Sequence, residues 1–229
     1  MFGLLETSLI DYPGKICSTI FFPGCNFLCP FCHNPELVKN TAQCQADLET
    51  IRAHLEKRRH VLDGVCLTGG EPLLKPKELA ILLPRIKEYG LLAKLDTNGY
   101  QPRALNTVIK QLDFIAMDIK SSPDKYHLAA GLPAVNLKNL EQSINMIKNS
   151  GLDYEFRTTV VPGLYDQEDA LKIGQWLKGS KKYVLQQYST RQAMLDPSCQ
   201  AIKPYPPSRL KEFQNLLRPY FGTVELRGI

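Results

Sequence analysis

Apolar and polar residues follow two different periods along this chain. Short apolar runs rich in β-branched and aromatic residues predict six strands, at 16–22, 63–67, 91–95, 113–118, 154–160 and 182–188. Segments with an apolar residue every three or four positions predict helices at 47–57, 76–89, 102–111, 138–149, 167–177 and 207–217. A last short run at 223–226 predicts an additional edge strand. Regular alternation of strands and helices is typical of a parallel sheet.

The number of strand–helix units limits the possible architectures. Six units are too few for a closed barrel of eight, so we expect an α/β fold with an open, partial (β/α)6 barrel of the TIM type. The chain has 229 residues, of which 44% are hydrophobic, which is enough to bury one full core. We therefore expect a single domain over residues 1–229.

Unusual motifs occur where the predicted strands end. The first strand leads into a cysteine-rich loop, and the later strands lead into Thr68-Gly69-Gly70-Glu71-Pro72, Asp96-Thr97-Asn98-Gly99, Asp118-Ile119-Lys120, Arg157-Thr158-Thr159 and Gln186-Gln187-Tyr188-Ser189. The carboxyl ends of parallel barrel strands meet on one face, which is where such barrels carry their chemistry. The sequence therefore predicts that these separate motifs form one site.

The cysteine loop is the most specific of these motifs. Cys25, Cys29 and Cys32 have the spacing C-x3-C-x2-C, and the remaining cysteines, which we expect to be ordinary thiols, are Cys17, Cys44, Cys66 and Cys199. An odd number of cysteines without a secretory signal favours metal binding over disulfides. Three thiolates suit a cubane iron–sulfur cluster with one open iron, or a zinc site completed by His33. Zinc is the weaker reading, because adjacent residues rarely bind the same ion.

The motifs after the second and third strands allow both a structural and a functional reading. Gly69-Gly70 suits a tight turn, and without Cβ atoms it also suits close approach of the backbone to a ligand's amine. Asn98-Gly99 is a turn signal. Asp96 and Thr97 precede that turn, where a carboxylate and a hydroxyl suit a ribose diol or a cation.

Charged residues on the fourth and fifth strands share a strand face. Asp118 and Lys120 lie two residues apart, as do Arg157 and Thr159, and side chains in strands alternate with period two. Asp118 and Lys120 form either an ordinary ion pair or a binding site for a ligand with charges of both signs. Arg157 is suited to clamp a carboxylate.

Net charge and hydropathy exclude several other functions. The net charge of +5 is modest, and the basic run at 56–60 lies at a predicted helix end, so we expect no nucleic-acid partner. No apolar run reaches the length of a membrane span, and the N-terminus lacks the pattern of a signal peptide. We expect a cytoplasmic protein. None of the four histidines has the spacing of a catalytic metal motif.

Together, the motifs resemble those of radical S-adenosylmethionine (SAM) enzymes, and among these the glycyl-radical-enzyme activases. The resemblance covers nearly the whole chain, from Leu9-Ile10-Asp11-Tyr12-Pro13-Gly14 through Cys32-His33-Asn34-Pro35 to Val224-Glu225-Leu226-Arg227-Gly228. Leu185-Gln186-Gln187-Tyr188 and the Leu226-Arg227-Gly228 ending are most similar to the activating proteins of anaerobic ribonucleoside-triphosphate reductase. Pyruvate formate-lyase activases are a close second. Where those have a histidine after the sixth-strand tyrosine, this chain has Ser189.

The resemblance implies cofactors and a role for each motif. A 4Fe–4S cluster would be held by Cys25, Cys29 and Cys32, and SAM would chelate its open iron. Phe31 matches the family's adenine contact. The segment holding the methionyl amine matches Gly69, Gly70 and Glu71. Other positions lining the cofactor match Asp96, Asp118, Lys120, Arg157 and Thr159. In pyruvate formate-lyase activase a monovalent cation is held at positions matching Asp96, Thr97 and Asp118.

The resemblance also implies a reaction and partners. One electron, from a donor such as flavodoxin or ferredoxin, cleaves SAM, and the 5′-deoxyadenosyl radical then removes hydrogen from a glycine Cα in a partner enzyme. This glycyl-radical enzyme is expected to be anaerobic ribonucleotide reductase. The alternatives are a pyruvate formate-lyase-type activase, a radical SAM enzyme acting on a small molecule, and a zinc-stabilised binding module.

Overall fold

The computed structural model describes residues 1–229 and contains one eight-stranded sheet. The strands follow chain order, and each neighbouring pair from β2 to β8 is parallel. Only β1 runs antiparallel to its neighbour. The strands are β1 (Gly3–Ser8), β2 (Cys17–Phe22), β3 (Gly64–Gly69), β4 (Leu92–Thr97), β5 (Phe114–Asp118), β6 (Asp153–Val160), β7 (Ser180–Gln187) and β8 (Phe221–Arg227).

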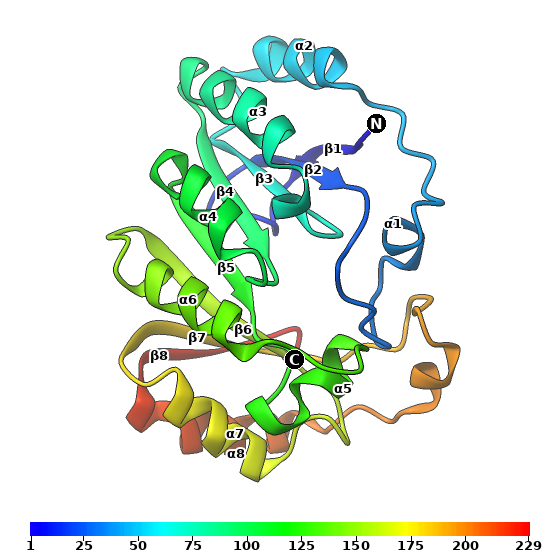
Figure 1. Ribbon diagram of the computed structural model, residues 1–229, viewed down its shortest axis with the longest axis vertical. Coiled ribbons are helices and arrows are strands. Elements are labelled where there is room, and N and C mark those ends of the chain that lie inside the picture. The colour runs from blue at the N-terminus through cyan, green and yellow to red at the C-terminus, as the bar shows by residue number, and fades with distance from the viewer.

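Helices cover the outer, convex face of this sheet (Figure 1). Six of them follow strands and lie along that face: α2 (Leu48–Arg58), α3 (Pro76–Glu88), α4 (Pro102–Val108), α6 (Leu137–Lys148), α7 (Gln167–Trp176) and α8 (Pro207–Leu217). Two shorter helices lie in loops, α1 (Pro35–Val38) and α5 (Tyr126–Ala130). No helix is long and apolar enough to span a membrane.

The sheet is curved but does not close, because β1 and β8 have no partner on their outer edges. The prediction of an open partial barrel is therefore confirmed, as are the six strands and the edge strand at 223–226. β1 was not predicted, because five of its six residues are exposed or partly exposed and no apolar face is evident. The helices α1 and α5 were also missed, since four or five residues are too few to show a helical period.

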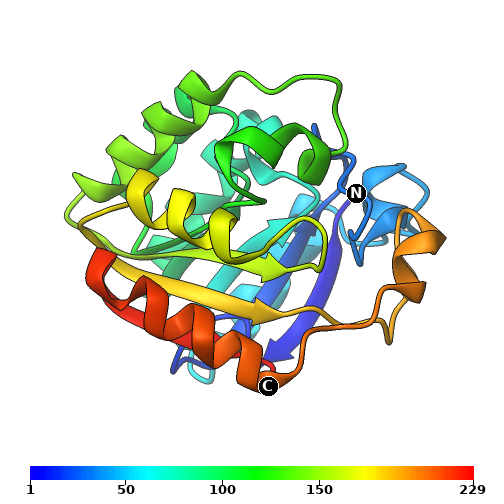
Figure 2. The same ribbon diagram turned by 90° about the horizontal axis from the view of Figure 1, so that it is seen from below.

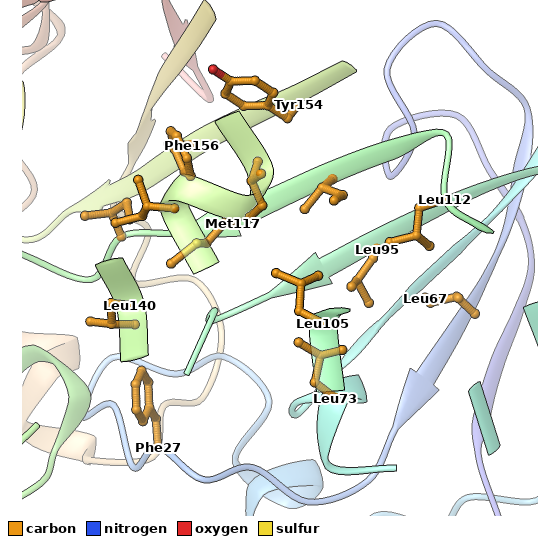
Figure 3. Packing of buried hydrophobic residues seen from close by; sticks show 14 of the residues in the cluster. Phe27, Leu67, Leu73, Leu95, Leu105, Leu112, Met117, Leu140, Tyr154 and Phe156 are labelled. Atoms are coloured by element: carbon orange, nitrogen blue, oxygen red, sulfur yellow. The ribbon is translucent and has the colours of Figure 1, made fainter. Parts of the chain in front are cut away.

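The main core lies between the sheet and the outer helices. It is part of one cluster of 51 buried residues, which also extends into the cysteine loop at Phe27, Cys29 and Phe31. Figure 3 shows Leu95, Met117 and Phe156 from successive strands packing toward Leu105 of α4 and Leu140 of α6.

Residues next to these apolar positions point the opposite way, because side chains alternate along a strand. The concave face of the sheet therefore carries Lys94 and Asp96 on β4, Asp118 on β5 and Arg157 on β6. The parallel register places Asp118 directly beside Arg157. The fold thus separates an apolar convex side from a polar concave side, and the motifs at the carboxyl ends of the strands border the polar side.

Candidate functional site

The start of the cysteine loop is held by the end of β3. The Gly70 N–H donates to Phe22 O at 2.8 Å, and the Glu71 N–H donates to Gly24 O at 2.8 Å. A Cβ atom on Gly70 would lie 2.0 Å from Gly24 O. Gly69 has a φ of +121°, and its Cβ would lie 2.3 Å from Phe22 N. The glycine pair is therefore required by a close approach of two backbone segments, the end of β3 and the start of the cysteine loop. The approach of this backbone to a ligand's amine stays a prediction.

Two further segments hold the middle and the end of this loop. The Leu28 N–H donates to Ala130 O at 2.8 Å, and a Cβ on Gly131 would lie 2.0 Å from Leu28 O. Near the end, Leu195 N–H donates to Cys32 O at 3.1 Å and Asp196 N–H donates to Pro30 O at 2.9 Å. Figure 2 shows the segment that follows β7, in orange, beside the blue cysteine loop. Backbone contacts from three distant parts of the chain therefore fix the positions of the thiols.

Gly70→Ala is expected to displace the cysteine loop, because the new methyl group meets a backbone carbonyl that cannot rotate away. Iron bound after anaerobic reconstitution should fall markedly, with about 1–3 kcal/mol lost in the free energy of unfolding. Iron analysis and thermal unfolding measure the two effects. Gly151→Ala is the control, since it adds backbone strain at a φ of +80° but meets no atom within 4 Å. Full iron content in Gly70→Ala would contradict this account.

The three thiols lie in a mostly buried environment. Cys29 is only 7% exposed, whereas Cys25 and Cys32 are half-buried. Burial raises the pKa of Cys25 to about 11 and that of Cys29 to about 12, while the positive charge of Lys120 acts against both shifts. Cys25 Sγ accepts a hydrogen bond from Phe27 N–H at 3.4 Å. A bound metal centre would keep these thiols deprotonated, and N–H groups directed at sulfur tune the potential of an iron–sulfur cluster.

The structure gives no support to a zinc site at this loop. His33 Nε2–H donates to Ser189 O at 2.9 Å, which leaves Nδ1 as the only ring nitrogen that could bind a metal. No group of three or more His, Cys, Asp or Glu side chains is gathered closely enough to hold one ion. A cubane cluster makes a different demand, because its thiolates bind separate irons.

Charged residues of alternating sign form a continuous row across the concave face, which we call the charge chain. In order, they are Lys94, Asp96, Arg157, Asp118 and Lys120. The Arg157 Nη2 to Asp96 Oδ2 distance is 3.1 Å, and the Lys120 Nζ to Asp118 Oδ2 distance is 2.9 Å. Arg157 Nε also contacts Asp118, and Lys94 Nζ contacts Asp96. Three cations and two carboxylates leave one net positive charge.

Both carboxylates of the charge chain, Asp96 and Asp118, are ionised. Burial alone would raise the pKa of Asp118, but Arg157 and Lys120 hold it well below its usual range. The same balance of burial against Arg157 and Lys94 lowers the pKa of Asp96. Side chains of Asp118 and Lys120 remain 26% and 19% exposed. A ligand with an ammonium and a carboxylate would therefore meet accessible groups of both signs.

Glu71 is fully buried and connects the end of β3 to the turn after β4. Its carboxylate accepts hydrogen bonds from Leu73 N–H at 3.0 Å, from the Thr97 hydroxyl at 2.8 Å and from Asn98 N–H at 2.7 Å. Burial raises its pKa to about 7, although these hydrogen bonds oppose the shift. The side chains of Glu71 and Thr97 thus point toward each other. Glu71 thereby links the turn after β3 to the turn after β4 through hydrogen bonds.

Glu71→Gln is expected to destabilise the fold by about 1–3 kcal/mol, because the new amide places an NH₂ group against a donor. Since the pKa of Glu71 is raised on folding, the stability it contributes at low pH is lost as pH rises from about 4.5 through about 7. Thermal unfolding across that range should show this loss in the native protein and a weaker dependence in Glu71→Gln. Identical pH profiles for the two proteins would contradict the buried position of this carboxyl.

Comparison with known proteins identifies the family. Residues 19–173 match the model of the radical SAM superfamily, which is more than half of the chain. The chain belongs to the radical SAM superfamily. It is therefore an enzyme, and its cofactors are a 4Fe–4S cluster and SAM. Family membership also removes the zinc-stabilised binding module from the alternatives.

Sequence relatives of this radical SAM enzyme include several activases. A Methanocaldococcus jannaschii protein named as a glycyl-radical enzyme activating enzyme is 29% identical, over 99% of this chain and 95% of its own. The pyruvate formate-lyase-activating enzyme of Clostridium pasteurianum is 29% identical over 72% of this chain and 69% of its own length. The pyruvate formate-lyase 1-activating enzyme of Escherichia coli is 26% identical over 74% and 71%.

Solved structures share the fold at low sequence identity. A radical SAM methyltransferase from Sphaerobacter thermophilus has a TM-score of 0.69 and 15% identity, over 94% of this chain and 67% of its own. Streptococcus suis SuiB bound to SAM also has a TM-score of 0.69, with 14% identity, over 92% of this chain and 52% of its own. These likenesses support the radical SAM fold alone.

The predicted site residues differ in where the structure places them. Asp96, Asp118, Lys120 and Arg157 come together in the charge chain, and Thr159 lies one step further along β6 on the same face. Thr97 lies on the opposite strand face from Asp96 and bonds to Glu71. The Phe31 ring is buried in the core cluster.

Sequence reasoning missed several residues that shape this radical SAM site. The Asn98-Gly99 pair indicates only a turn, yet the Asn98 side-chain amide lies 3.9 Å from Cys25 Sγ and donates to Asn26 Oδ1 at 2.8 Å. Gly131 packs against the cysteine loop and Leu195 bonds to it, both from distant segments, and no local pattern indicates such contacts. Lys94 did leave a signal, since a lysine inside an apolar strand shares the face of Asp96.

Proposed function

We propose that this radical SAM enzyme generates a glycyl radical on a partner enzyme, and that the partner is an anaerobic ribonucleotide reductase. The observation that carries the activase class is the M. jannaschii relative, which aligns over almost the full length of both chains. The reductase branch is favoured by the Leu185-Gln186-Gln187-Tyr188 strand end and the Leu226-Arg227-Gly228 ending. Ser189 departs from the pyruvate formate-lyase pattern and here supplies a backbone carbonyl to His33.

The residues of the chain would divide the work of holding the cofactors. Cys25, Cys29 and Cys32 hold the cluster, while Gly69-Gly70 and the charge chain hold SAM. Together these cofactors supply a one-electron cleavage that yields a carbon radical. Asp118 and Lys120 are the accessible pair of opposite sign, and they suit the ionic groups of SAM. Asn98 directs an N–H toward Cys25 and thereby adjusts the electrostatics of the cluster.

The open barrel suits a macromolecular substrate. Because β1 and β8 do not pair, the concave face is not enclosed by a complete ring of strands. An extended segment of a partner could therefore reach the charge chain from that side, whereas a closed barrel would block it. The captodative glycyl radical is stable enough to outlast the encounter, so a transient interface of modest area is sufficient.

The test is electron paramagnetic resonance under anaerobic conditions. Reduced protein, SAM and the candidate reductase should give the doublet signal of a glycyl radical, and the signal should disappear when the partner's glycine is changed to alanine. Pyruvate formate-lyase serves as a matched second partner. A radical on pyruvate formate-lyase alone would transfer the assignment to that branch. Formation of 5′-deoxyadenosine without a radical on either partner would reject the activase function in favour of a small-molecule substrate.

A further inference from the structure

The residues suggested for a monovalent cation do not fit such an ion in this structure. Asp96 Oδ1 contacts Lys94, and Asp96 Oδ2 accepts from Arg157 at 3.1 Å and from the Thr68 hydroxyl at 3.3 Å. The hydroxyl of Thr97 is directed to Glu71, on the opposite face of β4. Two of the three suggested ligands are therefore already bonded to groups of the protein.

The third suggested ligand, Asp118, is engaged in the same way. Its Oδ1 accepts from Arg157 Nε and its Oδ2 accepts from Lys120 Nζ at 2.9 Å. A metal cation would need to displace one of these cations, or to share a carboxylate oxygen with it at close range. Since the five residues of the charge chain already carry one net positive charge, an added cation would meet repulsion at short range.

Lys94 has the position and charge to make a metal cation unnecessary. Its side chain is 2% exposed, and its Nζ contacts Asp96 Oδ1 and lies 3.6 Å from Cys66 Sγ. A buried ammonium is costly unless it is paired and hydrogen-bonded. Asp96 is the only carboxylate that pairs with it. Lys94 lies two residues before Asp96, so strand periodicity directs both side chains to the concave face.

We propose that Lys94 is a built-in cation of the cofactor site and that this site takes no monovalent metal ion. The ammonium fixes one oxygen of Asp96, which leaves the other oxygen to hold Arg157. Arg157 in turn orients Asp118, the more exposed carboxylate. Lys94 is thus a positioning residue that acts through Asp96 and Arg157.

The native protein provides the first test. Its thermal unfolding midpoint and its affinity for SAM are measured in sodium chloride, potassium chloride and N-methyl-D-glucamine chloride at equal ionic strength. Both quantities are expected to be the same in all three salts. A saturable rise of either quantity with sodium or potassium would overturn the proposal. The unfolding midpoint needs neither cofactor nor partner, so this result is independent of whether the partner is a glycyl-radical enzyme.

Lys94→Met provides the second test, because it removes the ammonium group and keeps the unbranched shape of the rest of the side chain. In the organic cation its affinity for SAM should fall by about tenfold, and sodium or potassium should restore the affinity saturably. Metal rescue would not follow from a merely structural role. Lys77→Met on the exposed face of α3 is the control. An unchanged affinity, or a loss that no metal ion restores, would count against Lys94 as the built-in cation. If the variant does not fold, the native measurements still decide.

Discussion

Cys29→Ala is expected to abolish the visible absorbance and bound iron of the anaerobically reconstituted protein. Cys29 is the most buried of the three loop thiols and the central one in the C-x3-C-x2-C motif. With three thiolates for three irons there is no spare ligand to replace it. Cys25→Ala and Cys32→Ala should give the same result. Absorbance together with iron and sulfide analysis checks all three variants.

Two of the other four cysteines serve as controls for this prediction. Cys17 and Cys66 pack with Tyr12 in a small buried cluster, and both lie on strands rather than in the cysteine loop. Cys44 and Cys199 also lie outside that loop, on later segments. Alanine at Cys44 or Cys199 should leave iron content unchanged. Normal iron content in Cys29→Ala, or its loss in Cys44→Ala, would reject the assignment of the cluster ligands.

The sequence predicted the strands of this fold well, because buried parallel strands leave continuous apolar runs. It failed at β1, where the residues of an edge strand are largely exposed. The two short helices were missed for a related reason, since neither reaches two turns. The strands β2 to β7 could be predicted from the sequence because they are buried on both faces, and not because they form strands.

The site was predictable wherever strand periodicity alone decides which residues share a face. Asp118 and Lys120 are an example, and the structure pairs them. Contacts between separate segments could not be predicted, such as Arg157 with Asp96 across two strands or Glu71, which follows β3, with Thr97 at the end of β4. The contact of Gly70 with Gly24 depends on how two loops meet in space, and no single segment encodes it.

Asp118→Ala is expected to weaken SAM binding by about a hundredfold or more while the cluster remains. Asp118 contacts both Arg157 and Lys120, so its removal leaves two cations facing each other without their shared carboxylate. The free energy of unfolding should fall by about 3 kcal/mol. Lys120→Ala should also weaken binding, because it removes the accessible cation of the pair. Anaerobic calorimetry with SAM measures the affinity, and iron analysis verifies the cluster.

A general loss of stability and a specific loss of cofactor binding can be separated with Asp153→Ala and Asp118→Asn. Asp153 is an exposed residue at the amino end of β6, away from the carboxyl ends of the strands, and its substitution should leave affinity unchanged. Asp118→Asn keeps the size of the side chain and one acceptor oxygen but loses the charge. If the charge of Asp118 orients Arg157 and Lys120, the Asp118→Asn variant should bind SAM almost as weakly as the Asp118→Ala variant. Asp118 is the carboxylate of the charge chain that contacts both Arg157 and Lys120. Unchanged affinity for SAM in both Asp118→Ala and Lys120→Ala would therefore remove this pair from the cofactor site.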